Sequence, residues 1–242
     1  MHRFQYMMKF RSGVLRLLAL ISVAVSATAL PAQTDTLPVV TTEVNVDLVS
    51  RYIWRGMDVS KGPAIQPWLA ASWKGFSIGS WGSYNLTGEG CQETDFFVAK
   101  TLGFITVSVW DYWTFDDTSD LDFFNFRDES TAHLLEAQIL LSGGDKLPFN
   151  FLASYMFYGD DPSRSLYFEL QYEPNLNFAD LMLFAGYQAK GDMYNPKKGF
   201  VNVGCTVERS IDITDRLSLP LSLSLVVNPA DRKAWLVAGI TF

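Results

Sequence analysis

The chain has 242 residues, of which 26 are acidic and 19 basic, so its formal net charge is −7. This acidic balance argues against binding to nucleic acid, whose phosphates attract Lys and Arg. The chain holds 18 Phe, 10 Tyr and 7 Trp, but past its first 32 residues it lacks the run of about 18 apolar residues that a transmembrane helix needs. The composition therefore favours a protein that meets lipid along strands.

The N-terminus has the features of a secretory signal peptide over residues 1–32. Three basic residues precede an apolar stretch at 14–30, and small residues allow cleavage after Ala29 or, as we favour, after Ala32. An N-terminal membrane anchor is the alternative, but the apolar stretch is short for a span. We therefore expect an exported protein whose mature domain is 33–242.

Alternation of apolar and polar residues with a period of two recurs along the mature chain and is typical of β-strands, because successive side chains of a strand point to opposite faces. No segment has a convincing helical pattern. Twelve strands are predicted, an even number as bacterial outer-membrane barrels require. They lie near 43–54, 64–74, 76–86, 93–100, 103–115, 131–142, 147–158, 165–173, 180–190, 199–208, 214–227 and 233–242. The fold class is all-β, an antiparallel transmembrane barrel, and a soluble β-sandwich or lipocalin-like barrel is the alternative.

Aromatic residues gather near the ends of these strands, as in the two interfacial belts of membrane barrels. The outer belt is predicted to hold Tyr52, Trp54, Tyr84, Trp113, Phe157, Tyr187 and Trp235. The inner belt is predicted to hold Trp73, Phe76, Phe149 and Phe242.

Four short segments between Ser50 and Phe97 carry a family resemblance. They are Ser50–Gly56, Pro63–Gln66, Gly75–Ser83 and Glu93–Asp95. In this order and approximate spacing the chain resembles the TorF-like porin family, a group of conserved hypothetical outer-membrane barrels. The resemblance implies a small barrel regarded as a porin. Two departures are Phe97, where the family has Tyr, and an added acidic loop at 116–130.

The acidic loop at 116–130 is the longest predicted connection, and the longer connections are expected on the outer side. Its carboxylates suit calcium, but their spacing is not that of an EF-hand, so a solvated loop that bridges to lipopolysaccharide is favoured. Its aromatic residues, among them Phe123, Phe124 and Phe126, suggest that it folds back over or into the barrel mouth.

Catalysis and metal binding have weak support. The mature chain has one histidine, His133, on the predicted lipid face, and no Ser hydrolase motif accompanies it. Cys91 and Cys205 are predicted to lie too far apart for a disulfide. No catalytic residue, resident metal or cofactor is therefore predicted.

The last two strands predict the closure of the barrel. Residues 214–227 should pair with 233–242, and the final strand should close on 43–54. Leu236 and Phe242 would then face lipid, and Trp235 would face the lumen. A terminal aromatic such as Phe242 resembles the signal that barrel-assembly machinery recognises.

The charged residues on the predicted lumen face are the candidate pore-lining set. They are Asp47, Arg51, Arg55, Glu93, Asp95, Glu136, Glu169, Lys190 and Glu208. Such residues can line a hydrated path and set its ionic preference, or pair with one another and plug the lumen.

The sequence thus predicts a Gram-negative outer-membrane porin that is not an enzyme. It would pass small hydrophilic solutes with a weak preference for cations, and its surroundings would be outer-membrane lipid and lipopolysaccharide. The alternatives are a plugged structural barrel and a lipid-modifying enzyme.

Overall fold

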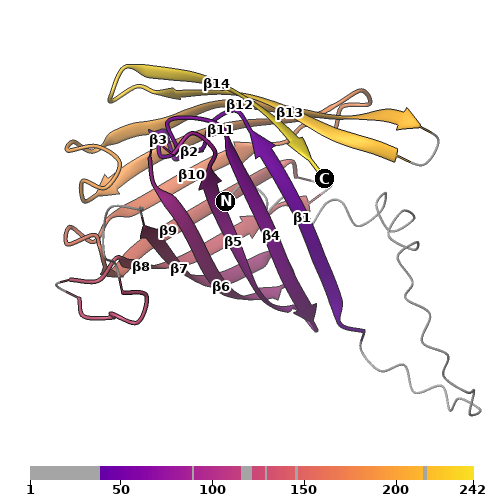
Figure 1. Ribbon diagram of the computed structural model, residues 1–242. Helices are drawn as coiled ribbons and strands as arrows, with labels where there is room; N and C mark the ends of the chain where they lie inside the picture. The colour runs from indigo at the N-terminus through magenta and orange to yellow at the C-terminus, as the bar shows by residue number, and fades with distance from the viewer. Residues whose placement is uncertain (1–38, 89, 116–121, 129, 145–146, 215–216) are drawn as a thin grey trace, which may run out of the picture.

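A computed structural model describes residues 39–88, 90–115, 122–128, 130–144, 147–214 and 217–242. Twelve antiparallel strands form a closed barrel in the order β1-β14-β13-β12-β11-β10-β9-β8-β7-β6-β5-β4, and β2 and β3 pair separately (Figure 1). The bounds are β1 Thr41–Val49, β2 Ile53–Trp54, β3 Met57–Asp58, β4 Ala64–Trp73, β5 Phe76–Asn85, β6 Gln92–Leu102, β7 Ile105–Phe115, β8 His133–Ser142, β9 Phe149–Gly159, β10 Leu166–Tyr172, β11 Asp180–Lys190, β12 Gly199–Thr214, β13 Leu217–Asn228 and β14 Lys233–Thr241. The predicted fold class and strand number are confirmed. The predicted signal peptide lies outside the described residues.

Each strand alternates between an apolar outer face and an inner face that is buried. On β4, Ile65 and Leu69 are exposed, whereas Gln66 and Trp68 between them are buried. The same period recurs around the barrel, in which every wall strand pairs with its two neighbours, and it is interrupted only where the register shifts, as between β10 and β11. No helix in the described part of the chain is long and apolar enough to cross a membrane.

The closing strands behave as the sequence predicts. Leu221 pairs with Ile240 between β13 and β14, and Asp47 pairs with Thr241 between β1 and β14. Leu236 and Phe242 are exposed on the outside. One boundary was wrong, because β12 runs on to Thr214 through the connection predicted at 209–213.

The first predicted strand, 43–54, was also wrong in its second half. The chain leaves the wall after Val49, which pairs with Ala64, and turns into the lumen. There β2 and β3 form a hairpin, with Trp54 opposite Met57. Arg55 and Gly56 form its turn with φ values of 47° and 79°, as a two-residue hairpin turn of type I′ requires. Tyr52 and Trp54, predicted for the outer belt, are consequently buried inside the barrel.

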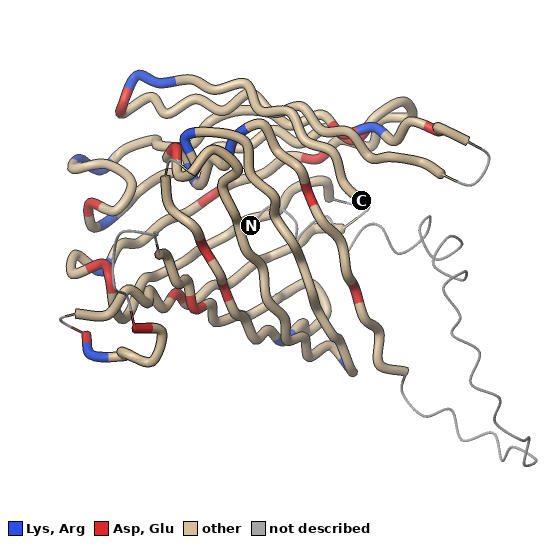
Figure 2. The backbone as a smooth tube through the Cα atoms, viewed as in Figure 1, with Lys and Arg blue, Asp and Glu red and all other residues tan. Residues whose placement is uncertain are grey.

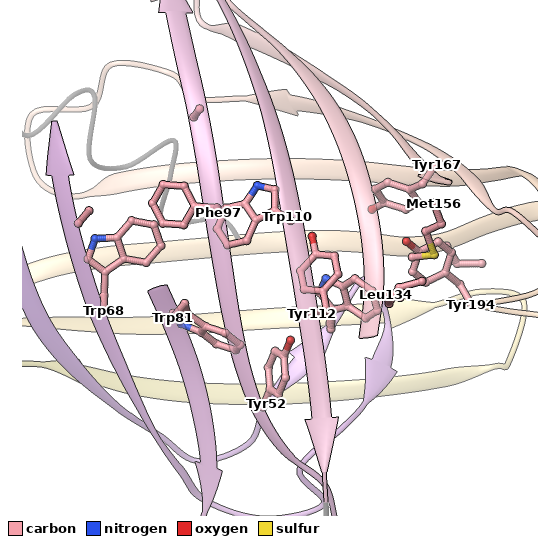
Figure 3. Packing of buried hydrophobic residues seen from close by; sticks show 14 residues of the cluster. Tyr52, Trp68, Trp81, Phe97, Trp110, Tyr112, Leu134, Met156, Tyr167 and Tyr194 are labelled. Atoms are coloured by element: carbon pink, nitrogen blue, oxygen red, sulfur yellow. The ribbon is translucent and has the colours of Figure 1, made fainter. Parts of the chain in front are cut away.

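An aromatic cluster fills the lumen around this hairpin (Figure 3). Trp68 stacks on Phe97 with ring centres 5.0 Å apart, and Phe97 stacks on Trp110 at 4.6 Å. Trp54 reaches Tyr112 of β7 at 5.3 Å. Rings at such distances add about 0.5–1.5 kcal/mol per pair beyond the area that they bury. Part of the barrel interior is therefore a packed core.

Candidate functional site: a plugged lumen above a polar cavity

Residues 51–62, which we call the plug, cross the lumen near the barrel end that carries the longer loops, the loop end. The plug holds its own shape. Arg51 Nη1 lies 2.6 Å from Asp58 Oδ2, and the backbone N–H of Tyr52 donates to Ser60 Oγ at 2.8 Å. It also contacts the wall two strands away from β1, where Asn228 Nδ2 of β13 donates to the carbonyl of Gly56 at 3.0 Å. The plug is thus joined to the wall on the β13 side of β1.

Arg55 fastens the plug to the wall through a buried ion pair. Its guanidinium donates to both oxygens of Glu136 on β8, from Nη1 to Oε1 at 2.5 Å and from Nη2 to Oε2 at 3.0 Å. It also donates to the hydroxyl of Tyr194 and lies 4.4 Å from the ring centre of Tyr167. Both charged side chains are almost fully buried. Loss of one partner from such a pair typically costs about 3–5 kcal/mol, because the other charge stays buried without compensation.

Gly56 allows the close approach that this contact needs. A Cβ atom at this position would lie 1.8 Å from the carbonyl oxygen of Val201, and the positive φ disfavours any other residue. Arg55 therefore provides the ion pair with Glu136, which we call the latch, and Gly56 allows the turn that brings Arg55 to the wall.

Below the plug, toward the end with the short turns, lies a cavity of about 210 Å³. Plug residues from Arg51 to Arg55 form its roof. Its walls carry carboxylates, amides and hydroxyls, and the polar lining residues are Asp47, Gln66, Thr106, Ser108, Gln138, Glu169, Gln171, Asn202, Thr206, Glu208, Ser222, Ser224 and Thr241. Trp81 and Phe184 add ring faces to the same cavity.

Glu169 is the most elaborately bonded of the lining acids. Its Oε1 accepts from Gln171 Nε2 at 2.5 Å, and its Oε2 accepts from Asn202 Nδ2 at 2.8 Å and from the hydroxyl of Tyr167. Three neutral donors thus satisfy its oxygens in this buried place. The cavity wall is therefore both acidic and ordered.

The structure brings together most of the predicted pore-lining residues. Five of them line the cavity and its roof: Asp47, Arg51, Arg55, Glu169 and Glu208. Glu136 holds Arg55, and Glu93 and Asp95 are buried on the lumen face of β6, where Glu93 accepts from the hydroxyl of Tyr52 at 3.3 Å. Their action in a pore stays a prediction.

Lys190 was placed wrongly. Tyr167 pairs with Gln188 but Leu166 pairs with Lys190, so Ala189 is an extra residue that reverses the parity of the strand end. Lys190 is exposed, and its Nζ lies 5.4 Å from the ring centre of Tyr155, which is exposed on the outer face. It therefore points away from the lumen.

Charge is unevenly distributed along the barrel. Acidic residues recur along the strands, whereas Lys and Arg gather mainly in loops and at strand ends (Figure 2). The two arginines of the cavity roof are each paired with a carboxylate, Asp58 for Arg51 and Glu136 for Arg55. The field of the cavity is therefore negative.

The described part of the acidic loop, 122–128 and 130–132, folds over the outside of the barrel and not into its mouth. Phe126 stacks on His133 with ring centres 4.1 Å apart, and Phe123 packs against Phe96 of the outer face at 6.1 Å. His133 is fully buried beneath it, with Nδ1 2.8 Å from Asp111 Oδ1 and Nε2 2.6 Å from the carbonyl oxygen of Phe123. Asp128 holds the edge of this loop: its carboxylate accepts from Gly159 N at 2.9 Å and pairs with Arg164.

These contacts occupy His133, the histidine of the described residues. Its Nδ1 lies against a carboxylate and its Nε2 against a carbonyl oxygen, so neither ring nitrogen is open to a nucleophile. Cys91 and Cys205 are not joined in a disulfide, in line with the prediction that they lie too far apart. In the described part of the chain, no group of three or more His, Cys, Asp and Glu side chains is placed to hold a metal ion.

Comparisons with known proteins give a family but no established activity. A family model described as "Bacterial protein of unknown function (Gcw_chp)" matches residues 32–225, so the chain belongs to that family. No curated protein matches. A solved structure titled "KdgM porin" is similar, with a TM-score of 0.48 and 9% identity over 84% of this chain and 98% of that one.

Proposed function

We propose that this member of the Gcw_chp family is an outer-membrane porin that rests closed. In this proposal the mature barrel, exported by its predicted signal peptide, passes small hydrophilic solutes with a weak preference for cations once the plug leaves the lumen. The TorF-like resemblance supports the same role.

The outer face supports a membrane location. Large apolar side chains are exposed all around the closed barrel, for example Val44, Leu69, Ile78, Val98 and Leu223. A soluble barrel would place such residues inside, since their exposure to water is unfavourable. Lipid is the surrounding that such a face needs, and a bacterial outer membrane is where barrels of this kind reside.

One observation carries the proposed transport role, the polar cavity beneath a plug whose contacts with the wall include the buried ion pair of Arg55 and Glu136. A purely structural barrel gains nothing from a buried charge pair, because apolar residues of similar volume are often as stable or more stable. A buried ion pair adds little net stability, but breaking it is strongly unfavourable. Such a pair is therefore suited to holding the plug in the lumen. The acidic residues of the cavity favour cations over anions.

We propose no catalytic role. The lipid-modifying alternative would need a base on the outer face, and His133 is engaged there at both nitrogens.

Planar-bilayer recording tests the proposal, with purified protein, the Glu136→Gln variant and Asp128→Asn as a control outside the lumen. Glu136→Gln leaves Arg55 buried without its counter-charge, so we expect rare openings in the wild type and at least tenfold more open time in the variant. Asp128→Asn should behave as the wild type. If the wild type and Glu136→Gln stay equally silent, the barrel is structural.

A further inference from the structure

The barrel closes on a short seam between its first and last strands. Toward the loop end, the last backbone contact of this seam joins Ser50 to Ala238, where Ser50 N donates to the Ala238 carbonyl at 2.8 Å. On its other side, β14 stays paired with β13 as far as Lys233. Figure 1 shows β14 continuing past the end of β1. In the described part of the chain, residues 233–237 therefore pair with a strand on one side only, and we call their other side the open edge.

The open edge presents backbone groups in register with β1. In an antiparallel ladder, every second residue directs its N–H and C=O to the same neighbour. Ala238 directs both to Ser50, since its N–H donates to Ser50 Oγ at 2.9 Å and its carbonyl accepts from Ser50 N. Leu236 and Ala234 therefore point theirs the same way, beyond the end of β1. An edge of this kind is a template for a further strand.

The first residues of the plug match this template. Continued by the register of Val49 with Gly239, β1 would place Tyr52 opposite Leu236 and Trp54 opposite Ala234. Both rings would then lie on the outer face near the loop end, at the depth where membrane barrels carry aromatic belts. The sequence pattern and the open edge thus point to the same pairing.

Ile53 already lies on the side of the lumen where β14 runs. It packs against a small cluster on the inner faces of β11 and β13, and Trp235 of β14 packs against the same cluster. In the continued register, Ile53 would stand opposite Trp235. The plug therefore begins beside the strand that it would join.

We propose that the open edge of β14 is the binding site for residues 50–54 of the same chain when the pore is open. β1 then has two lengths: it ends at Val49 when the plug fills the lumen and at Trp54 when the plug has left. This inference rests on the proposed function and deepens it, because it states where the first half of the plug goes. In the long form, Arg55 leaves Glu136 and follows Trp54 toward the loop end.

The two forms bond the same backbone groups. In the lumen, Tyr52 N donates to Ser60 Oγ at 2.8 Å and the Tyr52 carbonyl accepts from Val59 N at 3.0 Å. In the wall, the N–H and carbonyl of Leu236 replace these partners. Two packings of one segment that satisfy the same groups form a two-state element, whose populations small changes in free energy can shift.

Disulfide trapping in the detergent-solubilised full-length protein tests the pairing. The two native cysteines are replaced by serine, and Glu136→Gln loosens the plug. In the lumen, the Tyr52 ring packs on Trp81 of β5 with ring centres 5.1 Å apart (Figure 3). We expect Tyr52→Cys to cross-link to Leu236→Cys at least tenfold faster than to Leu225→Cys. Leu225 pairs with Leu236 from β13, so it lies two strand spacings from the added strand, about 10 Å, beyond the reach of a disulfide.

Three outcomes would overturn the proposal. They are equal rates for the two cysteine pairs, no cross-link of either pair in the folded barrel, and disulfide-linked dimers of Leu236→Cys alone that form as fast, which would assign the edge to a second copy. Cross-linking is read by mass spectrometry and does not require conduction. A selective cross-link in a barrel that never conducts would therefore refute the pore alone, and conduction without that cross-link would refute the strand extension alone.

A second measurement leaves the plug residues 50–54 unchanged. Leu236→Pro removes the N–H that the Tyr52 carbonyl would accept, and proline is tolerated at the edge of a sheet. In the Glu136→Gln background it should shorten the open time at least tenfold. Val44→Pro is the matched control, because the Val44 N–H faces the same seam beyond the pair of Val46 and Phe242, and it should leave the open time unchanged. Equal open times in the two proline variants would overturn the proposal.

Discussion

Two loops at the same end of the barrel fold back onto its wall, one inward and one outward. The plug, 51–62, enters the lumen, whereas the described residues 122–128 and 130–132, the outer loop, cover the outer face of β6 to β8. The plug is held by the ion pair of Arg55 with Glu136. The outer loop is held by the stacking of Phe126 on His133 and by the contact between His133 Nε2 and the carbonyl oxygen of Phe123.

The two contacts differ in what they control. The inner one lies across the lumen, and the outer one covers the contact between His133 and Asp111 on the outer face. Variants that break each loop separately should therefore have different consequences.

The largest effect is expected from breaking the inner ion pair without replacing it. Glu136→Leu leaves the Arg55 charge buried alone, so the seating of the plug should weaken by about 3–5 kcal/mol. The double variant Arg55→Met/Glu136→Leu should restore much of it. Amide hydrogen exchange of residues 51–62 measures this, and equal protection in the single and double variants would contradict the latch.

A smaller but still large effect is expected from Gly56→Ala. The new Cβ would collide with the Val201 carbonyl, and the residue would sit at a φ of 79°. Backbone strain alone costs on the order of 1–3 kcal/mol, so the plug should lose protection from exchange. Gly103→Ala is the matched control, because its φ is 61° but nothing lies within 4 Å. An equal loss of stability in both variants would show that the fit against Val201 is unimportant.

The outer loop should respond to His133→Ala without any change in the lumen. The variant leaves Asp111 without its partner and removes the stacking on Phe126, so 122–132 should be cleaved faster by protease. Loss of a buried hydrogen-bonded group of this kind costs about 1–3 kcal/mol. Channel recordings of His133→Ala should match those of the wild type. A change in open time would mean that the two loops are coupled.

The smallest effect is expected from lowering the pH, which protonates Asp128 at the edge of the outer loop. The hydrogen bond from Gly159 N and the pairing with Arg164 hold the pKa of Asp128 below its usual value. A lowered folded-state pKa stabilises the loop above the ordinary Asp pKa of about 3.9, and this contribution is lost as the pH falls through the folded value. Protease cleavage should therefore be unchanged between pH 7 and pH 5 and should rise below about pH 4. Asp128→Asn should remove that rise.

The barrel itself was predictable because the period-two pattern is local. Every strand shows it, and the pairing of neighbours follows from the short turns between them. The same parity placed Asp47, Glu136 and Glu169 correctly on the lumen side.

The plug was missed because the pattern of the first strand continues into it. Tyr52 and Trp54 keep the parity of Val44 and Leu48, so a straight strand predicts them on the lipid face. The departure into the lumen is set by contacts far away in the sequence, above all with Glu136 and Tyr194. One local signal was available, because Arg55-Gly56 is a turn sequence that can lie inside a hairpin.

The buried rings could have been found from parity alone. Trp68 shares its face with Gln66 and Ala70, opposite Ile65 and Leu69. Lys190, in contrast, could not be placed, since the bulge at Ala189 leaves no sequence mark and moves one side chain to the other face.

The most direct test of the closed pore is the conductance of a barrel without its plug. Val49 and Ala64 face each other in the ladder of β1 and β4, so residues 50–63 can be replaced by Asn-Gly, which forms a two-residue hairpin turn. We predict steady cation-selective channels from this variant and near silence from the wild type under the same conditions. A shortened barrel that folds but remains as silent as the wild type would contradict the account.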